Sequence, residues 1–383
     1  MSMPGSVMLG TMAQRLGRGP EEVTMDFGVF VATKIDDWQL IRFAEELGYR
    51  RAWVPDSQMI WSDCYATLAL AAANTRKIQI GTGVAIPGTR TAPVTAHSIA
   101  SINRLAPGRV FLGIGSGHTA MRVMGMDPMK IREWREYLRV VRTLLDGQEV
   151  DYTLNGVTRA IRFLHLDLGF IALEPRIPIY VAANGPLALK VAAEFADGLV
   201  SVGNEHPPVL ASHLAALRAG AAKLGRTLSP SFHTATLTSA VVLKPGERVD
   251  SERVVAQCGS QVAAVLHFAY EIVKLTGNEA AVPRGFEDVW EEYCDHVERM
   301  ETPPEKRYLQ IHEGHCTYLV PAERRFVNEK TIRASVLVGT PDELVARIRT
   351  AEQAGLKEIG LLPPMAEARN VLREFSEQVM ARL

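Results

Sequence analysis

The chain has 383 residues, of which 47% are hydrophobic and 22% charged, and its formal net charge is −1. This balance gives no electrostatic reason to expect a nucleic acid or an anionic membrane surface as a partner, and no apolar run reaches the roughly 18–20 residues needed to span a bilayer. The length allows two ordinary domains or one α/β barrel with insertions. Four widely spaced cysteines without a CxxC pair fit reduced thiols in a cytoplasmic protein.

Apolar periodicity and turn residues divide the chain into strands and helices. Residues 1–24 contain glycine, serine and arginine but no apolar run long enough for a signal peptide, so we expect a flexible extension there. The strands are expected, in chain order, to begin at Met25, Ala52, Ile78, Val110, Ile177, Gly198, Phe232 and Glu358. Helices are expected over residues 36–47, 65–74, 93–105, 128–145, 187–196, 207–224, 251–275, 341–354 and 369–383.

The segment 78–118 has the clearest organisation. An apolar strand at 78–84 is followed by a helix at 93–105 and by a second apolar strand at 110–114. Strands without polar and apolar alternation are buried on both faces, and a right-handed crossover through a helix makes them parallel. The chemistry of this unit is therefore expected at the C-terminal ends of its strands.

Glycines mark both of those strand ends. Gly81 and Gly83 weaken the first strand, which suggests a bulge or the close approach of a flat ligand to the backbone. After the second strand, Gly115-Ser116-Gly117-His118 leaves backbone amides open to an anion, although a tight turn gives the same pattern. Two glycine-marked strand ends in one unit favour a ligand site.

The rest of the chain predicts a barrel with one interruption. Asn155-Gly156 lies between short alternating runs and indicates a polar hairpin at 149–170. Residues 244–335 lose the strand and helix register and are too long for an ordinary connection, so we expect an insertion that covers the active face or contacts another subunit. Eight strands separated mostly by helices predict an α/β fold, the (β/α)8 TIM barrel. A doubly wound sheet lacks a GxGxxG after its first strand.

Five segments together resemble the bacterial luciferase-like family of flavin and deazaflavin oxidoreductases. They read FGVF, AWVPDS, IQIGTGVAIPGTRTAPVTAHSIASINRLAPGRVFLGIGSGH, IPIYVAANGPLALKVAAEFADGLV and VLVGTPDELVARIRTAEQAGLKEIGL. Within the family, the sequence resembles above all the methylenetetrahydromethanopterin reductase group, which uses the deazaflavin coenzyme F420. The resemblance covers residues 25–243 and 336–383. It implies one luciferase-like TIM barrel over 25–383, with the insertion at 244–335.

The resemblance also implies a coenzyme ring that lies over the strand ends. In the family a bulge with a non-proline cis peptide backs the ring, and the matching bond here is Gly83–Val84. The arm 115–117 and the turn 183–186 match positions that hold the coenzyme's phosphate and ribityl chain. With F420 as the coenzyme and FMN as the alternative, the implied cofactor-binding residues are Asp56, Thr82, Gly83, Val84, Gly115, Ser116, Gly117, His118, Ala183, Asn184, Gly185 and Pro186.

Two departures from the family pattern concern acid and base groups. The group usually has a His directly after the Asp that follows the second strand, whereas Ser57 follows Asp56 here, and it often has a Glu where Phe30 stands. His118 lies where some deazaflavin members have a glutamate beside the ring. A His there could exchange a proton near neutral pH or only cap the loop. The catalytic candidates are therefore His118, Asp56 and Ser57.

Three further residues near the strand ends are candidates with a structural alternative. Asp56 could bond the coenzyme or cap the next helix. Arg90 could contact a phosphate or the substrate, or stand in a solvated loop. Trp61 could form a wall of the substrate pocket, although core packing is the ordinary role of such a residue.

The sequence HEGHC in the insertion offers a different kind of candidate. His312 and His315, with Glu313 and Cys316, could form half a metal site. Because the sequence shows no second ligand cluster, we predict no metal and expect His312 and His315 in a polar lid over the substrate.

The leading hypothesis is an F420-dependent oxidoreductase that moves a hydride between the deazaflavin and a small organic substrate. The second hypothesis keeps the fold but is an FMN-dependent monooxygenase. The third is a hydrolase or binding protein on a barrel that has lost the redox coenzyme. A homodimer or higher homo-oligomer is expected from the resemblance, with the apolar second and third helices contributing to its interface.

Overall fold

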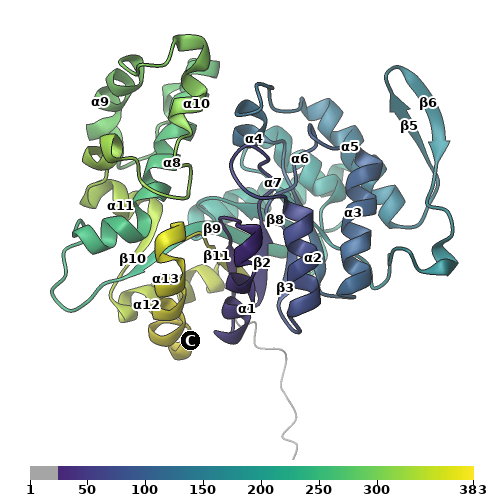
Figure 1. The fold of residues 1–383 in the computed structure, drawn as a ribbon, viewed down its shortest axis with the longest axis horizontal. Helices are drawn as coiled ribbons and strands as arrows, with labels where there is room; N and C mark the ends of the chain where they lie inside the picture. The colour runs from purple at the N-terminus through teal and green to yellow at the C-terminus, as the bar shows by residue number, and fades with distance from the viewer. Residues whose placement is uncertain (1–24) are drawn as a thin grey trace, which may run out of the picture.

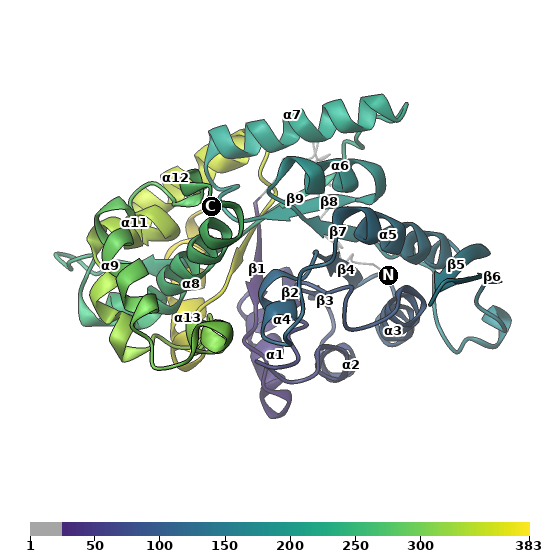
Figure 2. The ribbon, with the colours of Figure 1, turned by 90° about the horizontal axis from the view of Figure 1, so that it is seen from above.

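The computed structural model describes residues 25–383, so the flexible extension predicted at 1–24 lies outside the described residues. Eight parallel strands close into a barrel with helices around it, which confirms the predicted fold class (Figures 1 and 2). The barrel strands are β1 (Asp26–Phe30), β2 (Arg51–Val54), β3 (Gln79–Thr82), β4 (Val110–Ile114), β7 (Ile179–Ala182), β8 (Gly198–Ser201), β9 (His233–Val242) and β11 (Glu358–Leu361). Around the barrel each strand pairs with the next in this order, β9 pairs with both β8 and β11, and β11 pairs back to β1.

The helices that cover the barrel bury one apolar stripe each. In α5 (Ile131–Leu145) the buried residues Trp134, Leu138, Val141 and Leu145 recur every three or four positions, which places them on one face. The other helices of the barrel are α1 (Gln39–Glu46), α2 (Cys64–Asn74), α3 (Ala92–Leu105), α4 (His118–Arg122), α6 (Pro186–Phe195), α7 (Pro207–Lys223), α12 (Pro341–Gln353) and α13 (Ala368–Gln378). All of these except the short α4 were predicted from the sequence.

A buried charged network lies inside the barrel. The Glu358 side chain is fully buried and accepts hydrogen bonds from Trp53 Nε1 at 2.7 Å and from Arg51 Nη1 at 3.2 Å. His233 Nε2 lies 2.6 Å from the second carboxylate oxygen. Burial raises the pKa of Glu358, but Arg51, His233 and Trp53 together lower it below its ordinary value. Gly28 leaves room for this carboxylate, because a Cβ there would lie 2.1 Å from Glu358 Oε1.

The insertion forms a lobe beside the barrel, between β9 and a short strand, β10 (Val336–Gly339), which the sequence did not predict (Figure 1). The first half of the ten-residue β9 belongs to the barrel, whereas its residues 239–242 pair in parallel with β10. The lobe has its own hydrophobic core around Leu266, Phe286, Tyr293 and Phe326. Its helices are α8 (Glu252–Thr276), α9 (Glu287–Glu298), α10 (Arg307–Ile311) and α11 (Glu329–Ser335).

A β-hairpin extends from the opposite side of the barrel to the lobe (Figure 1). It consists of β5 (Val150–Leu154) and β6 (Val157–Ile161), which pair antiparallel as predicted. Asn155 and Gly156 both have positive φ, 51° and 78°, as a two-residue hairpin turn requires. Among residues 25–383, none of the helices is both long enough and apolar enough to cross a bilayer.

Candidate active site

A hollow of about 180 Å³ lies at the carboxyl ends of the barrel strands. Its walls come from three parts of the chain: the strand ends, the segment after β4 and the lobe. The lining residues are Phe30, Pro55, Ser57, Trp61, Gly83, Val84, Ile86, Gly117, His118, Thr119, Ala120, Leu237, His315, Cys316 and Leu362. Both glycine-marked strand ends of the sequence therefore meet at one hollow.

The Gly83–Val84 peptide forms part of the floor and is cis, as the resemblance implied. The peptide packs on the indole of β2, because a Cβ on Gly83 would lie 2.5 Å from the Cβ of Trp53. Trp53 in turn stacks on Phe30, with ring centroids 5.1 Å apart. Phe30, which stands where the family often has a Glu, is therefore part of the aromatic packing beneath the floor.

The glycine arm after β4 brings the candidate His118 to the hollow. Gly117 has a φ of 84°, and a Cβ there would lie 2.7 Å from Met121 Cγ, so both conformation and space favour glycine. Gly117 and His118 line the hollow, whereas Gly115 is buried against Val84. Gly115 and Ser116 thus continue the arm outside the hollow.

His118 faces a carboxylate from the lobe. Its Nδ1 lies 3.4 Å from Glu271 Oε2 on α8, and its ring centroid lies 5.0 Å from that of Phe268. Arg122 Nε approaches the same carboxylate oxygen at 3.5 Å. Burial lowers the pKa of His118 to about 4, although Glu271 opposes the shift. This differs from the expected proton exchange near neutral pH, because the imidazole is uncharged at pH 7.

Asp56 and Arg90 are bound to each other outside the hollow. Arg90 Nη1 donates to both oxygens of the buried Asp56 carboxylate, at 2.6 and 2.8 Å, and Gln58 Nε2 donates to it at 2.7 Å. Arg90 also pairs with Asp63 at 2.9 Å and lies over the ring of Tyr65. Burial raises the pKa of Asp56, and the Arg90 guanidinium opposes this rise. The sequence suggested separate ligand contacts for these two residues, but their charged groups are engaged with each other.

Ser57 and Trp61 hold the positions that the sequence analysis gave them, because both line the hollow. The Ser57 hydroxyl makes no hydrogen bond to any residue in 25–383, which leaves it available to a ligand. Trp61 Nε1 donates to Thr317 Oγ1 at 3.0 Å, and its ring lies 6.1 Å from that of His315. Trp61 therefore connects the loop after β2 to the lobe.

Two of the implied coenzyme positions lie away from the hollow. The Thr82 hydroxyl donates to the Gly113 carbonyl at 2.6 Å and is buried within the barrel wall, so it is not free for a ligand. The turn 183–186 follows β7, and there Asn184 accepts a hydrogen bond from Ser201. Gly185 and Pro186 are exposed at the start of α6.

The HEGHC segment places its two histidines differently. His315 lines the hollow together with Cys316, as expected of a lid. His312 lies behind it and is buried, with Nε2 3.0 Å from Glu271 Oε1. Sequence reasoning missed Glu271 and Phe268, which approach His118 from α8. No motif marks these two residues, and only the fold brings α8 to the barrel mouth.

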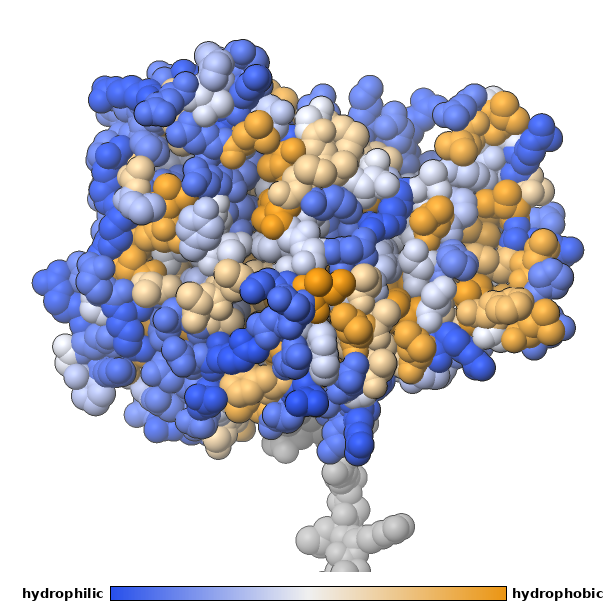
Figure 3. Space-filling view, viewed as in Figure 1, coloured by the Kyte–Doolittle hydropathy of each residue, from blue (hydrophilic) through white to orange (hydrophobic). Residues whose placement is uncertain are grey.

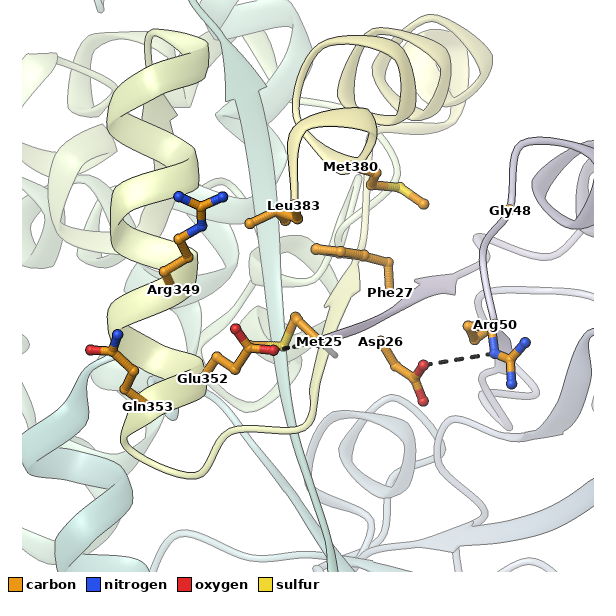
Figure 4. Close-up of a pocket in the computed structure, with 10 residues that line it drawn as sticks. All are labelled: Met25, Asp26, Phe27, Gly48, Arg50, Arg349, Glu352, Gln353, Met380 and Leu383. Atoms are coloured by element: carbon orange, nitrogen blue, oxygen red, sulfur yellow. Dashed lines mark hydrogen bonds and ion pairs between the residues drawn. The ribbon is translucent and has the colours of Figure 1, made fainter. Parts of the chain in front are cut away.

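A larger hollow, of about 760 Å³, lies at the opposite end of the barrel, where β1 begins (Figure 4). There the Met25 backbone N–H donates to Glu352 at 2.7 Å, and Arg50 lies 3.7 Å from Asp26. The amino-terminal end of a barrel reads as a stability face, whereas active sites lie at the carboxyl ends of the strands. This hollow also borders Met25, the first described residue, so its walls are described without residues 1–24.

Comparison with known proteins gives a consistent picture. A family model described as luciferase-like monooxygenase matches residues 25–358. A 5,10-methylenetetrahydromethanopterin reductase of Methanolobus tindarius is 35% identical over 187 residues, which are 48% of this chain and 55% of that protein. An F420-dependent glucose-6-phosphate dehydrogenase of Beutenbergia cavernae is 27% identical over 354 residues, which are 89% of this chain and 90% of that protein.

The chain spans only part of the reductases it resembles, namely 55%, 66% and 57% of three of them. Over a longer stretch, its fold is found in the solved coenzyme F420 dependent tetrahydromethanopterin reductase from Methanopyrus kandleri. That match has a TM-score of 0.67 at 21% identity and covers 94% of this chain and 99% of that one. At this identity the likeness shows a shared fold, which agrees with the barrel described above.

Proposed function

This chain belongs to the luciferase-like monooxygenase family, and on that premise we propose that it is an F420-dependent oxidoreductase acting on a small organic substrate. The proposal rests above all on the hollow at the strand ends, which joins a glycine-marked floor to a buried imidazole. The printed names of several relatives, among them the Beutenbergia cavernae dehydrogenase, include F420.

The residues around the hollow fit one flat ring system. The floor offers Gly83, Val84 and Leu237, which are small or apolar. At about 180 Å³ the hollow is smaller than the roughly 300–1,000 Å³ of sites that enclose a whole drug-sized ligand. The remainder of a coenzyme would therefore lie outside, along the arm 115–117 and the exposed turn 184–186, where backbone amides could bind a phosphate. F420 supplies two-electron hydride exchange when it is bound.

The groups of this chain would then orient the substrate. Glu271 can only accept a hydrogen bond when ionised, which favours the proton of His118 on Nδ1 and leaves the lone pair on Nε2. With a pKa of about 4, His118 stays neutral at pH 7 and would bind a substrate hydroxyl as an acceptor. The Ser57 hydroxyl offers a donor in the same hollow, and Trp61 shields this wall from water.

The first test is equilibrium binding of F420 and of FMN to the purified chain, followed by absorbance and fluorescence. We expect micromolar binding of F420 and much weaker binding of FMN. The variant Gly83→Val should abolish ring binding because its side chain would meet Trp53, whereas Gly185→Ala, with open space around it, should bind like the wild type. Reduction of bound F420 by members of a panel of small alcohols would then identify the substrate class.

An FMN-dependent monooxygenase is the second candidate, because the matching family description names monooxygenases. Tight binding of FMN alone, with oxygen consumption in the presence of a reductant, would favour it over the F420 enzyme. Binding of neither coenzyme would contradict both proposals. A coenzyme-free hydrolase or binding protein on the same barrel would then remain.

We propose a homodimer that uses the outer face of α2 and α3. Leu70, Val94 and Leu105 on these helices are 36%, 48% and 54% exposed, and apolar side chains gather over this part of the surface (Figure 3). Light scattering should give twice the chain mass, and Val94→Glu should shift the protein to monomer. The four cysteines are free thiols, which supports the proposed cytoplasmic location.

A further inference from the structure

Three histidines meet inside the lobe, close to the hollow but behind its roof. They are His267 on α8, His312 directly after α10 and His315 in the next loop. One ring atom of each lies within 4.8 Å of the corresponding atoms of the other two. The side chains of His267 and His312 are each only 2% exposed. The fold therefore gathers three buried imidazoles from positions that are up to 48 residues apart in the sequence.

Carboxylates fix the hydrogen on two of these rings. His267 Nε2 lies 2.8 Å from Glu323 Oε1, and His312 Nε2 lies 3.0 Å from Glu271 Oε1. An ionised carboxylate only accepts hydrogen bonds, so each Nε2 carries the hydrogen and each Nδ1 keeps a lone pair. The Nδ1 atoms of His267, His312 and His315 are all buried and have no hydrogen-bond partner among residues 25–383.

Such unpartnered acceptors need an explanation. A buried polar atom without a partner costs about 1–3 kcal/mol, and here three of them lie in one cluster. A divalent cation bound by the three lone pairs would remove this cost. A histidine ligand commonly donates its other ring N–H to a carboxylate, and His267 and His312 already show this arrangement.

The cluster also has an approach from the surface. His312 and His315 line an open hollow of about 630 Å³, together with Met59, Leu309 and Tyr318. His315 lines the active-site hollow as well. An ion could thus enter from outside, and once bound it would lie next to the proposed coenzyme site.

We propose that His267, His312 and His315 bind a divalent transition-metal ion, with Zn²⁺ as the preferred ion. Three imidazole nitrogens suit zinc and leave one coordination position for water. The sequence predicted no metal because HEGH had no second ligand cluster, and His267 supplies the missing ligand. The ion would attach the segment 312–315 to α8 and so hold the roof of the active-site hollow in place.

Metal analysis of the chain purified without a histidine tag tests this proposal directly. We expect about one zinc per chain, removable by a chelator, and rebinding of Co²⁺ with the visible absorbance of a nitrogen-ligated ion. His312→Gln should lose the metal. His97→Gln, at an exposed histidine on α3, is the matched control and should retain it.

A second variant keeps the test decisive where a ligand substitution prevents folding. Glu323→Gln leaves all three ligands in place and should weaken Zn²⁺ binding by about 10–100-fold, as substitutions of the partners of metal ligands do. A wild-type chain that contains no metal and gives no Co²⁺ absorbance would overturn the proposal, as would equal metal content in folded His312→Gln and wild type. Metal content is read without F420, so the failure of this proposal and that of the coenzyme proposal are distinguishable.

Discussion

The substitution Asp56→Asn separates a structural role of this residue from a role in coenzyme binding. The carboxylate accepts two hydrogen bonds from Arg90, at 2.6 and 2.8 Å, and one from Gln58. An amide keeps a single acceptor oxygen and places an N–H₂ against these donors. Breaking a buried ion pair costs about 3–5 kcal/mol. Because Arg90 is partly exposed and keeps Asp63, we expect the lower end, about 3 kcal/mol.

Asp63→Asn is the matched control, because Asp63 pairs with the same arginine. Its carboxylate is 51% exposed and shares one hydrogen bond with Arg90, so its loss should cost less than about 1 kcal/mol. Asp63 also caps α2 by accepting from the Ala66 N–H at 2.8 Å, and asparagine caps a helix equally well.

Urea unfolding followed by tryptophan fluorescence measures both losses, and F420 titration measures binding by the folded variants. We expect Asp56→Asn to lower the free energy of unfolding while the affinity for F420 changes little. The reasoning would be refuted if Asp56→Asn kept wild-type stability but lost most of its F420 affinity, since the carboxylate would then contact the coenzyme.

Three other outcomes follow from the buried groups. Glu358→Gln should cost about 3–5 kcal/mol at pH 7 by leaving Arg51 without its buried partner. The pKa of Glu358 is lowered in the fold, so its contribution is present above the unfolded value near 4.3 and is lost as pH falls. Equal losses in urea unfolding at pH 7 and below about pH 4 would contradict this. In nuclear magnetic resonance titrations, His118 should change protonation near pH 4, and a midpoint near 6.5 would disprove its desolvation. Gly117→Ala should lose about 1–2 kcal/mol in the same unfolding assay because of its positive φ, whereas Gly185→Ala should lose almost nothing.

The barrel could be predicted from the sequence because its strands are short apolar runs with helical stripes between them. All eight barrel strands begin within two residues of the predicted starts. The strand β10 was missed because Val336–Gly339 directly follows α11 and pairs only with the outer half of β9. Local pattern does not reveal that pairing, which depends on the length of β9.

The floor of the site could also be predicted, since Gly83 and Gly117 leave a visible signal in the sequence. What surrounds His118 could not, because Glu271 lies 153 residues later in a helix without a motif. Nor does the sequence show that Arg90 binds Asp56, since both lie in loops that meet only after the barrel closes. His267 is hidden for the same reason, as one more residue in a long amphipathic helix.

The separate core of the lobe has a consequence for how such a protein can diversify. Leu266, Phe286 and Tyr293 pack among themselves, whereas the floor of the site belongs to the packing of the barrel. Substitutions in the lobe can therefore reshape the roof over the substrate without disturbing the coenzyme floor. Natural variation or directed evolution of substrate range should accordingly concentrate in residues 243–335, and the barrel mouth should tolerate far fewer changes.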